Sequence, residues 1–435
     1  MDPELVQQMF EEGGTLILLG MPATTEFGID LNSWNVGDRF KGVKMIPPGL
    51  HFIYFSAVSR QGDTAPRTGF FHVFKQREIL VRHYDPKAED LIEEDVNSEE
   101  VENIRSNLRD LDRYLGAYPI ESWEKWISLT QYIASEELER MIPKSGRICS
   151  VIELASVNTW HRTVKRSESG SLISQAASES SCSANQLDPG LQTDDMEQQP
   201  GTSEFKTHNS DGSSLIILSS EPEIAEPKPV MPEMIPKEGT EFRFSKFPAR
   251  PYRDGATPSE VTRYSLDSSY SIRQMIAKVD KPESMLAELQ LAFICFLVGQ
   301  VWDGWEHWRR LLSDLCRAEE LVKQYPELYN KFLSILHFQI YEVPEDLFID
   351  IVESNNFLAS ALTALFANIS DNAAALPVSL VKKASRFKVH ITNKFKWDLS
   401  VEDEGEDAPV IVETEDLSAN ETVEPSSTDV AVLTS

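Results

Sequence analysis

Residues 20–57 read GMPATTEFGIDLNSWNVGDRFKGVKMIPPGLHFIYFSA, and this stretch decides the class of the first domain. Two runs rich in Val, Ile, Phe and Tyr, at residues 42–46 and 51–57, stand on either side of Pro47-Pro48-Gly49. Such side chains fit a pleated, half-buried surface, and proline and glycine mark the turns between strands. The stretch therefore predicts consecutive β-strands.

The same pattern extends to both sides of this stretch. Further strand-like runs occupy residues 15–19, 69–74 and 79–84, at a spacing of about ten residues with no helical pattern between them. This spacing predicts an antiparallel β-sandwich or a partly open barrel. Helical patterns follow at residues 101–115 and 121–134, with Asn97 and Glu100 as a capping pair and Gly116 as a stop signal.

From about residue 260 to residue 397 the pattern is helical throughout. Residues 285–298 are apolar on nearly all sides, which is typical of a central buried helix, and an amphipathic pattern covers residues 301–322. Proline at positions 326, 344 and 377 separates further helices. We therefore expect an α+β protein with an N-terminal β-sandwich-like domain, carrying packed helices, and a C-terminal all-α helical domain.

The charge is unevenly distributed along the 435 residues, whose net charge is −29. Residues 167–236 contain 14 Ser, 12 acidic residues and two Lys, and residues 398–435 contain 12 acidic residues with no Lys or Arg. Stretches of this composition bury too little apolar surface to offset their ordering entropy. We predict a β-rich domain at 1–160, a disordered linker at 161–236, a helical domain at 237–397 and a flexible acidic tail at 398–435.

Sequence motifs give no sign of catalysis, a cofactor or a metal. GxGxxG, GxxxxGK[ST], GxSxG, HExxH and CxxC are absent, and the eight His are scattered without ligand spacing. The chain does not begin like a secretory signal and has no apolar run long enough to cross a bilayer. Its four Cys show no paired spacing, which fits free thiols in a reducing compartment. We expect no enzyme, no membrane association and no direct binding to bare nucleic acid.

Four residues in the β-region could carry chemistry. His51 and His72 could face one another across strands, either as partly exposed strand histidines, which we favour, or as the catalytic base of a hydrolase. Asp30 and Asp38 flank a turn, and we interpret them as turn residues whose side chains bond their own backbone.

The C-terminal half offers other candidates. Glu306-His307 is a poor acid–base pair because adjacent helical residues point apart, so we expect a structural role. Trp305 and Trp308 share an apolar face and favour core packing, whereas Trp302 lies off that face. The cationic last helix is interpreted as a solvated face or a counterpart for the acidic tail, with RNA contact as an alternative; its cations are Lys382, Lys383, Arg386, Lys388, Lys394 and Lys396.

The acidic tail contains a short β-prone segment, Pro409, Val410, Ile411 and Val412. A free strand of this type can add to the edge of another protein's sheet through main-chain hydrogen bonds. Plain disorder is the alternative for this segment.

Several motifs together resemble the Aar-two splicing factor family, whose members assemble the spliceosomal U5 snRNP. The resemblance covers about 5–160 and 237–413. It rests on the 20–57 block, with its EFGID and KMIPPG elements, and on the motifs WISLT at 126–130, GTEFRFS at 239–245, GATP at 255–258 and ELQLAF at 288–293.

The resemblance implies a non-enzymatic protein with a β-sandwich-like domain and an α-helical domain. It implies binding to the largest U5 protein, pre-mRNA-processing-splicing factor eight, through that protein's RNase H-like and Jab/MPN domains, and a block on premature docking of the U5 RNA helicase. It also implies that the tail adds a strand to its partner at positions 409–412. Phosphorylation would trigger release, with Ser219 and Ser220 as candidate sites, and the protein would occupy the nucleus and the cytoplasm.

Overall fold

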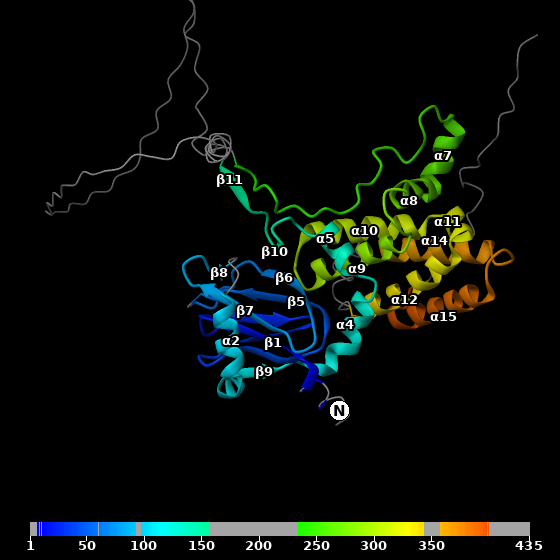
Figure 1. Ribbon diagram of the computed structural model, residues 1–435. Helices are drawn as coiled ribbons and strands as arrows, with labels where there is room; N and C mark the ends of the chain where they lie inside the picture. Colours follow the sequence, from blue (N-terminus) through cyan, green and yellow to red (C-terminus); the bar gives the residue numbers. More distant parts are fainter. Residues whose placement is uncertain are drawn as a thin grey trace, which may run out of the picture. The chain divides into compact units, whose positions relative to one another are not determined.

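The computed structural model describes residues 11–59, 61–92, 97–156, 234–342 and 357–397, together with Gln7, Met9 and Leu399 (Figure 1). One unit, residues 1–153 and 237–435, contains a β-rich domain and a helical domain. In the other unit, residues 154–236, the structure describes the antiparallel pair β11 (Leu154–Ser156) and β12 (Met234–Pro236). Within the described ranges, no helix is both long and apolar enough to span a membrane. The predicted linker at 161–236 lies outside the described residues except for β12, and the predicted tail does so except for Leu399.

Two five-stranded sheets form the β-rich domain, in the orders β8-β7-β1-β4-β9 and β10-β6-β5-β2-β3. Their strands are β1 (Gly14–Leu19), β2 (Glu26–Ile29), β3 (Asn32–Asn35), β4 (Gly42–Ile46), β5 (Gly49–Ser56), β6 (Thr68–Phe74), β7 (Ile79–Asp85), β8 (Asp90–Leu91), β9 (Leu115–Ala117) and β10 (Arg147–Cys149). The prediction of a β-sandwich-like domain is confirmed. The prediction of purely antiparallel strands is wrong, because β1 pairs with β7 and β4 with β9 in parallel.

Successive side chains of each strand point to opposite faces of its sheet, and this alternation gives the domain its layers. Leu16 and Leu18 of β1 point between the sheets, where they pack with Phe27 of the second sheet, while Ile17 points to the other face. That outer face is covered by α2 (Ser98–Ser106) and α3 (Leu108–Leu111). On the second sheet, Phe52 of β5 belongs to the core shared with the helices that follow. Each sheet therefore buries both faces.

The helices that follow the strands are shorter than predicted. Asn97 is the N-cap of α2, as expected, since its side chain accepts a hydrogen bond from the Glu99 N–H. The predicted pairing with Glu100 is wrong, because the Glu100 carboxylate lies 3.0 Å from His83 Nε2 instead. The predicted helix at 101–115 is interrupted at Asn107, whose side-chain amide bonds the Asn103 carbonyl. The predicted helix at 121–134 is limited to α4 (Trp123–Thr130), and α5 (Ser135–Met141) follows it.

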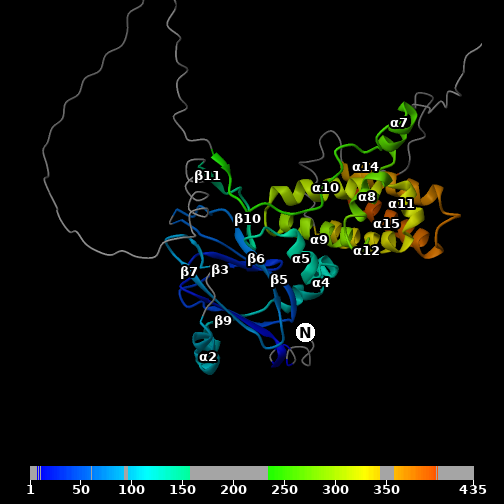
Figure 2. The same cartoon turned by 45° about the horizontal axis from the view of Figure 1, so that its top comes forward.

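The helical domain consists of α-helices over the whole range predicted, as far as the structure describes it (Figure 2). These are α7 (Pro258–Leu266), α8 (Ser269–Ile276), α9 (Ser284–Leu297), α10 (Trp302–Cys316), α11 (Glu319–Gln324), α12 (Pro326–Glu342), α14 (Phe357–Asp371) and α15 (Val378–Phe395). The prediction of a central buried helix is confirmed: α9 is buried from Ser284 to Cys295 and contacts α10 and α12 as well as α4 and α5. The predicted amphipathic helix at 301–322 is divided at Arg317-Ala318. Pro326 begins α12 and Pro377 directly precedes α15, as expected.

Candidate functional site

A closed hydrogen-bond network lies inside the β-rich domain around Asp30 and His51. His51 Nδ1 lies 2.7 Å from Asp30 Oδ2, and His51 Nε2 lies 2.7 Å from the Pro47 carbonyl oxygen. The Tyr118 hydroxyl donates to Asp30 Oδ2 (2.6 Å), and the Phe52 N–H donates to Asp30 Oδ1 (2.9 Å). Asp30 and His51 are 1% and 0% exposed. Because both ring nitrogens face protein oxygens and the ring is fully buried, neither nitrogen is open to a substrate.

These positions correct two predictions. His51 is not a partly exposed strand histidine, since Phe74, Tyr118 and the stacked ring of Trp123 enclose it. Asp30 does lie in a turn, with φ of 54°, but its carboxylate bonds the core rather than its own backbone. Asp38 is exposed, away from this network.

His72 lies opposite His51 in the β5–β6 register, so the two histidines do face one another across strands as predicted. His72 Nε2 lies 2.9 Å from Glu78 Oε1, and burial lowers the pKa of His72. The ring lines a hollow of about 390 Å³ beside Arg82 and Arg147, and Arg147 is already paired with Asp90 at 2.6 Å. In the part of the chain that the structure describes, no three His, Cys, Asp or Glu side chains gather as a metal site would need.

Glu288 is a fully buried carboxylate in the middle of α9. It accepts hydrogen bonds from the Ser245 N–H and hydroxyl, both at 2.8 Å, while Arg140 Nη2 lies 3.4 Å away and His307 Nε2 2.7 Å away. Ser245 belongs to an extended segment, residues 241–251, which we call the strap. Glu288 thus fastens the strap and α5 to the helical domain.

Burial alone would raise the pKa of Glu288, but the His307 ring and the Ser245 donors hold it below its usual range. His307 is stacked against Phe244, with ring centroids 4.4 Å apart, and Phe244 is stacked in turn against Phe242 at 5.0 Å. The structural role predicted for Glu306-His307 therefore holds for His307.

A second buried polar residue of α9 joins the helical domain to α4. Gln290 Oε1 accepts from the Tyr132 N–H at 3.0 Å, and Gln290 Nε2 donates to the Ser128 carbonyl at 3.2 Å. On the other side of α4, Trp126 Nε1 donates to the Leu50 carbonyl of β5 at 2.6 Å. The two domains are thus connected through α4 by directional bonds as well as by apolar packing.

An exposed aromatic and cationic surface lies where α4 meets α12 and α15. Two adjoining hollows of about 280 and 290 Å³ share His337 and Phe338, and their walls come from these three helices. Phe338 is 37% exposed and Tyr341 is 56% exposed. The ammonium groups of Lys125 and Lys394 lie 5.7 and 5.1 Å from the Tyr341 ring centroid. We call Lys125, His337, Phe338, Tyr341 and Lys394 the junction surface.

The cations of the last helix are not a plain solvated face. Lys383 donates to the Asn330 carbonyl at 2.6 Å, and burial lowers its pKa. Lys394 donates to the carbonyls of Ile340 and Tyr341, at 3.2 and 3.3 Å, in the last turn of α12. Lys382, Arg386 and Lys396 remain exposed. Two of the six cations therefore hold α15 to α12.

The tryptophans of α10 lie as expected. Trp305 and Trp308 are buried, and Trp308 Nε1 donates to Gln339 Oε1 at 3.0 Å. Trp302 is 63% exposed.

Comparison with known proteins gives matches over both domains. A family model described as the AAR2 N-terminal domain matches residues 12–143, and one described as the AAR2 C-terminal repeat region matches residues 244–400. "Protein AAR2 homolog" of Mus musculus is 40% identical over 417 residues, which is 95% of this chain and 97% of the relative. The Homo sapiens protein of that name is 37% identical over the same shares, and the Caenorhabditis elegans protein is 34% identical over 92% of this chain and 98% of its own. The chain belongs to the AAR2 family. This membership supports a splicing-related role.

The motifs behind the resemblance to this family meet in the AAR2 fold described above. Glu288 and Gln290, both in ELQLAF, bond Ser245 of GTEFRFS and Ser128 of WISLT. Thr257 of GATP is the N-cap of α7 in a capping box with Glu260, and Pro258 begins that helix. Residues of these motifs thus form contacts that join the β-rich domain to the helical domain.

Other predicted positions remain untested. Pro409, Val410, Ile411 and Val412, and the candidate phosphorylation sites Ser219 and Ser220, lie outside the described residues. Sequence reasoning also missed the junction surface, since exposure of Phe338 and Tyr341 has no sequence signal. Glu288 and Gln290 did have one, because they are polar residues inside an apolar run.

Proposed function

We propose that this AAR2 family chain is a non-enzymatic assembly factor of the U5 snRNP that acts in pre-mRNA splicing. It binds pre-mRNA-processing-splicing factor eight and delays docking of the U5 RNA helicase. Family membership supports the splicing context. The enclosed Asp30–His51 network supports a role without catalysis, because a base must reach its substrate's proton.

The single observation that carries the binding role is the junction surface. Exposed aromatic side chains are frequent anchors of protein interfaces. Tyr341 and Phe338 stand on α12, where the buried Gln339 accepts from Trp308 Nε1 of α10 and donates to the Leu289 carbonyl of α9. A surface fixed in this way loses little conformational freedom on binding, which favours affinity. We assign it to the RNase H-like domain of the partner.

The tail supplies a second contact. Residues 409–412 form a β-prone segment within an acidic stretch, which suits strand addition to a sheet edge of the Jab/MPN domain. A partner held by two tethered contacts gains effective concentration, so loss of one contact weakens the whole.

The test of the junction surface is a binding titration with the isolated RNase H-like domain. Truncating one interface anchor costs about 2 kcal/mol or more, which is about 30-fold in affinity, so Tyr341→Ala with Phe338→Ala should weaken binding by about 30-fold or more. The matched control is Trp302→Ala, which removes an aromatic side chain that is 63% exposed on α10. Equal affinities of the double variant and the unmodified chain would remove the junction surface from the proposal. If the unmodified chain did not bind at micromolar concentrations, the RNase H-like domain would be excluded as its partner.

The test of the tail is deletion of residues 398–435. We expect weaker binding to the Jab/MPN domain and nearly unchanged binding to the RNase H-like domain. Equal affinity for the Jab/MPN domain with and without the tail would exclude strand addition.

Regulation and location form the last part of the proposal. Phosphorylation at Ser219 or Ser220, next to Glu221, would release the partner, and the factor would work in both nucleus and cytoplasm. The variant carrying Ser219→Glu and Ser220→Glu should lose affinity for the partner, whereas the Ala pair should not. Unchanged affinity of the Glu variant would rule these two sites out.

A further inference from the structure

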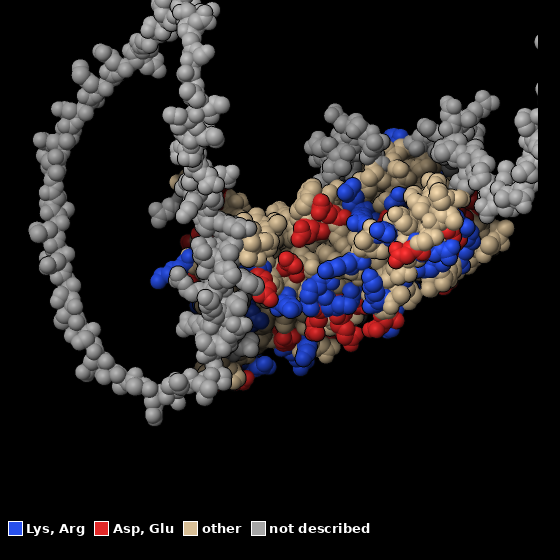
Figure 3. Space-filling model, turned by 90° about the horizontal axis from the view of Figure 1, so that it is seen from above, with Lys and Arg blue, Asp and Glu red and all other residues tan. Residues whose placement is uncertain are grey.

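A polar hollow of about 540 Å³ lies on the helical domain, away from the residues of the junction surface. Its floor is one face of α10, from Glu306 to Asp314, and continues to Arg317, the C-cap of that helix. Pro248 of the strap and Tyr264 of α7 contribute walls. Figure 3, which looks down on the top of Figure 1, shows Lys and Arg side chains gathered across this side of the molecule with acidic side chains at the borders.

Three guanidinium groups line the hollow. Arg309 and Arg310 are exposed, and neither has a carboxylate partner at ion-pair distance among the residues that the structure describes. Arg310 lies over the Phe247 ring, 4.1 Å from its centroid, which fixes the guanidinium while leaving its N–H edges available. Arg317 Nη2 bonds Asp314 Oδ1 at 2.9 Å.

Hydroxyl groups add further donors. Ser265 and Ser268 use their hydroxyls on backbone carbonyls, those of Val261 and Asp314. The hydroxyls of Ser271, Ser313 and Tyr264 also line the hollow and bond no other described residue. Guanidinium and hydroxyl donors around one space match the acceptor oxygens of a phosphate group.

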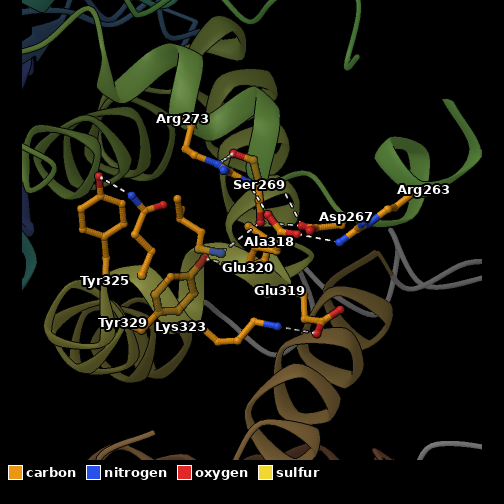
Figure 4. Close-up of polar contacts among 12 residues, drawn as sticks. Arg263, Asp267, Ser269, Arg273, Ala318, Glu319, Glu320, Lys323, Tyr325 and Tyr329 are labelled. Atoms are coloured by element: carbon orange, nitrogen blue, oxygen red, sulfur yellow. Dashed lines mark hydrogen bonds and ion pairs between the residues drawn. The ribbon is translucent and has the colours of Figure 1, made fainter. Parts of the chain in front are cut away.

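The walls are held in place before any ligand binds. Glu320 of α11 accepts from Arg263 Nη2 of α7 at 2.7 Å and from Arg273 Nη2 of α8 at 2.6 Å (Figure 4). Ser269 Oγ accepts from the Leu321 N–H at 3.0 Å, which ties the start of α8 to α11. Since α7 has no buried residue, the ion pair between Arg263 and Glu320 holds this helix in place of core packing.

The charge and size of the hollow limit the chemical class of ligand that it can bind. Three Arg outnumber Glu306 and Asp314, and Asp314 is already paired with Arg317. The space exceeds one phosphate, and Pro248 and Phe357 offer apolar contact beside the donors. We propose that this hollow binds the phosphate monoester of a phosphorylated serine in a peptide. The site is independent of the proposed partner and of the junction surface.

The experiment is calorimetric titration of the full chain with a pentapeptide that carries phosphoserine between alanines. Its unphosphorylated twin and inorganic phosphate are titrated in parallel. We expect the phosphopeptide alone to bind measurably at about 1 mM or below. Arg309→Ala with Arg310→Ala should weaken this binding at least tenfold, since the double change removes two guanidinium groups that would donate to the phosphate. Glu306→Gln should tighten binding, because it removes a negative charge three residues from Arg309.

The control variant is Arg386→Ala, which removes an exposed cation of α15 and should leave binding unchanged. Thermal unfolding of each variant establishes that its fold is intact. Three results would overturn the proposal: no binding of the phosphopeptide, equal binding of its unphosphorylated twin, or equal loss with Arg386→Ala. Binding of inorganic phosphate as tight as that of the phosphopeptide would overturn the assignment to a peptide.

Discussion

Replacing Glu288 by Ala tests whether one buried carboxylate holds the strap to the helical domain. The change removes the acceptor of the Ser245 N–H and hydroxyl and the carboxylate that pairs with Arg140 and contacts the His307 ring. Each of these groups is left without its partner in a buried site, at a cost of about 1–3 kcal/mol for each. The costs do not add fully, and removal of one partner from a buried ion pair destabilises by about 3–5 kcal/mol. We expect a loss in the free energy of unfolding of that size.

Two assays separate the local effect from the global one. Urea unfolding gives the change in stability from the shift of the midpoint at constant slope. Hydrogen exchange should show faster exchange at the Ser245 amide, whose acceptor is lost, and at the Arg243 amide, which donates to Met141 at 2.8 Å. Glu288→Gln should cost less, since its amide oxygen can still accept from Ser245. A loss below about 0.5 kcal/mol in Glu288→Ala, with strap amides unchanged, would refute the role given to this residue.

Three further outcomes are expected. His51→Ala should cost about 3–5 kcal/mol in urea unfolding because it removes a hydrogen-bond partner of the buried Asp30 and leaves a cavity beside the Trp123 ring, whereas a cost within 1 kcal/mol would show that the network adds little. The pKa of Glu288 is lowered in the folded state, so its stabilising contribution is present above the unfolded value of about 4.3 and is lost as pH falls through the folded value. Urea midpoints measured from pH 7 to pH 3 should therefore fall less steeply in Glu288→Gln, and parallel curves would contradict this. Thr257→Ala removes the capping box of α7 and should cost about 1 kcal/mol with faster exchange at the Glu260 amide; unchanged exchange there would argue against the cap.

Much of the fold follows from local patterns. The strands near residues 42–46, 51–57, 69–74 and 79–84 were predicted because their side chains are β-branched and aromatic between turn residues. The strands β2 and β3 were missed, since Gly28 and the polar run from Asn32 to Asn35 lack that composition. Gly28 is there because the Tyr54 ring lies where its side chain would be. The parallel pairing of β1 with β7 joins residues more than sixty positions apart and has no local signal.

The candidate sites likewise include residues whose position could be predicted from local sequence and residues whose position could not. Trp305 and Trp308 could be placed in the core from helical spacing alone. The burial of His51 could not, because it depends on Asp30, Pro47 and Tyr118, which come together only when both sheets form. The exposure of Phe338 and Tyr341 likewise depends on where α4 and α15 end, which is a property of the packed domains.

The strap has a consequence for how the polypeptide can be divided. The strap and the residues just before it contact the first domain: Lys237 pairs with Glu153 at 3.1 Å, and Arg243 of the strap donates to the Ile142 carbonyl at 2.8 Å. Together with the bonds of Glu288 and Gln290, these contacts make covalent continuity through residues 157–233 unnecessary for holding the halves together. Fragments ending at 156 and starting at 234 should associate when expressed as separate genes, and a foreign protein could be inserted between them.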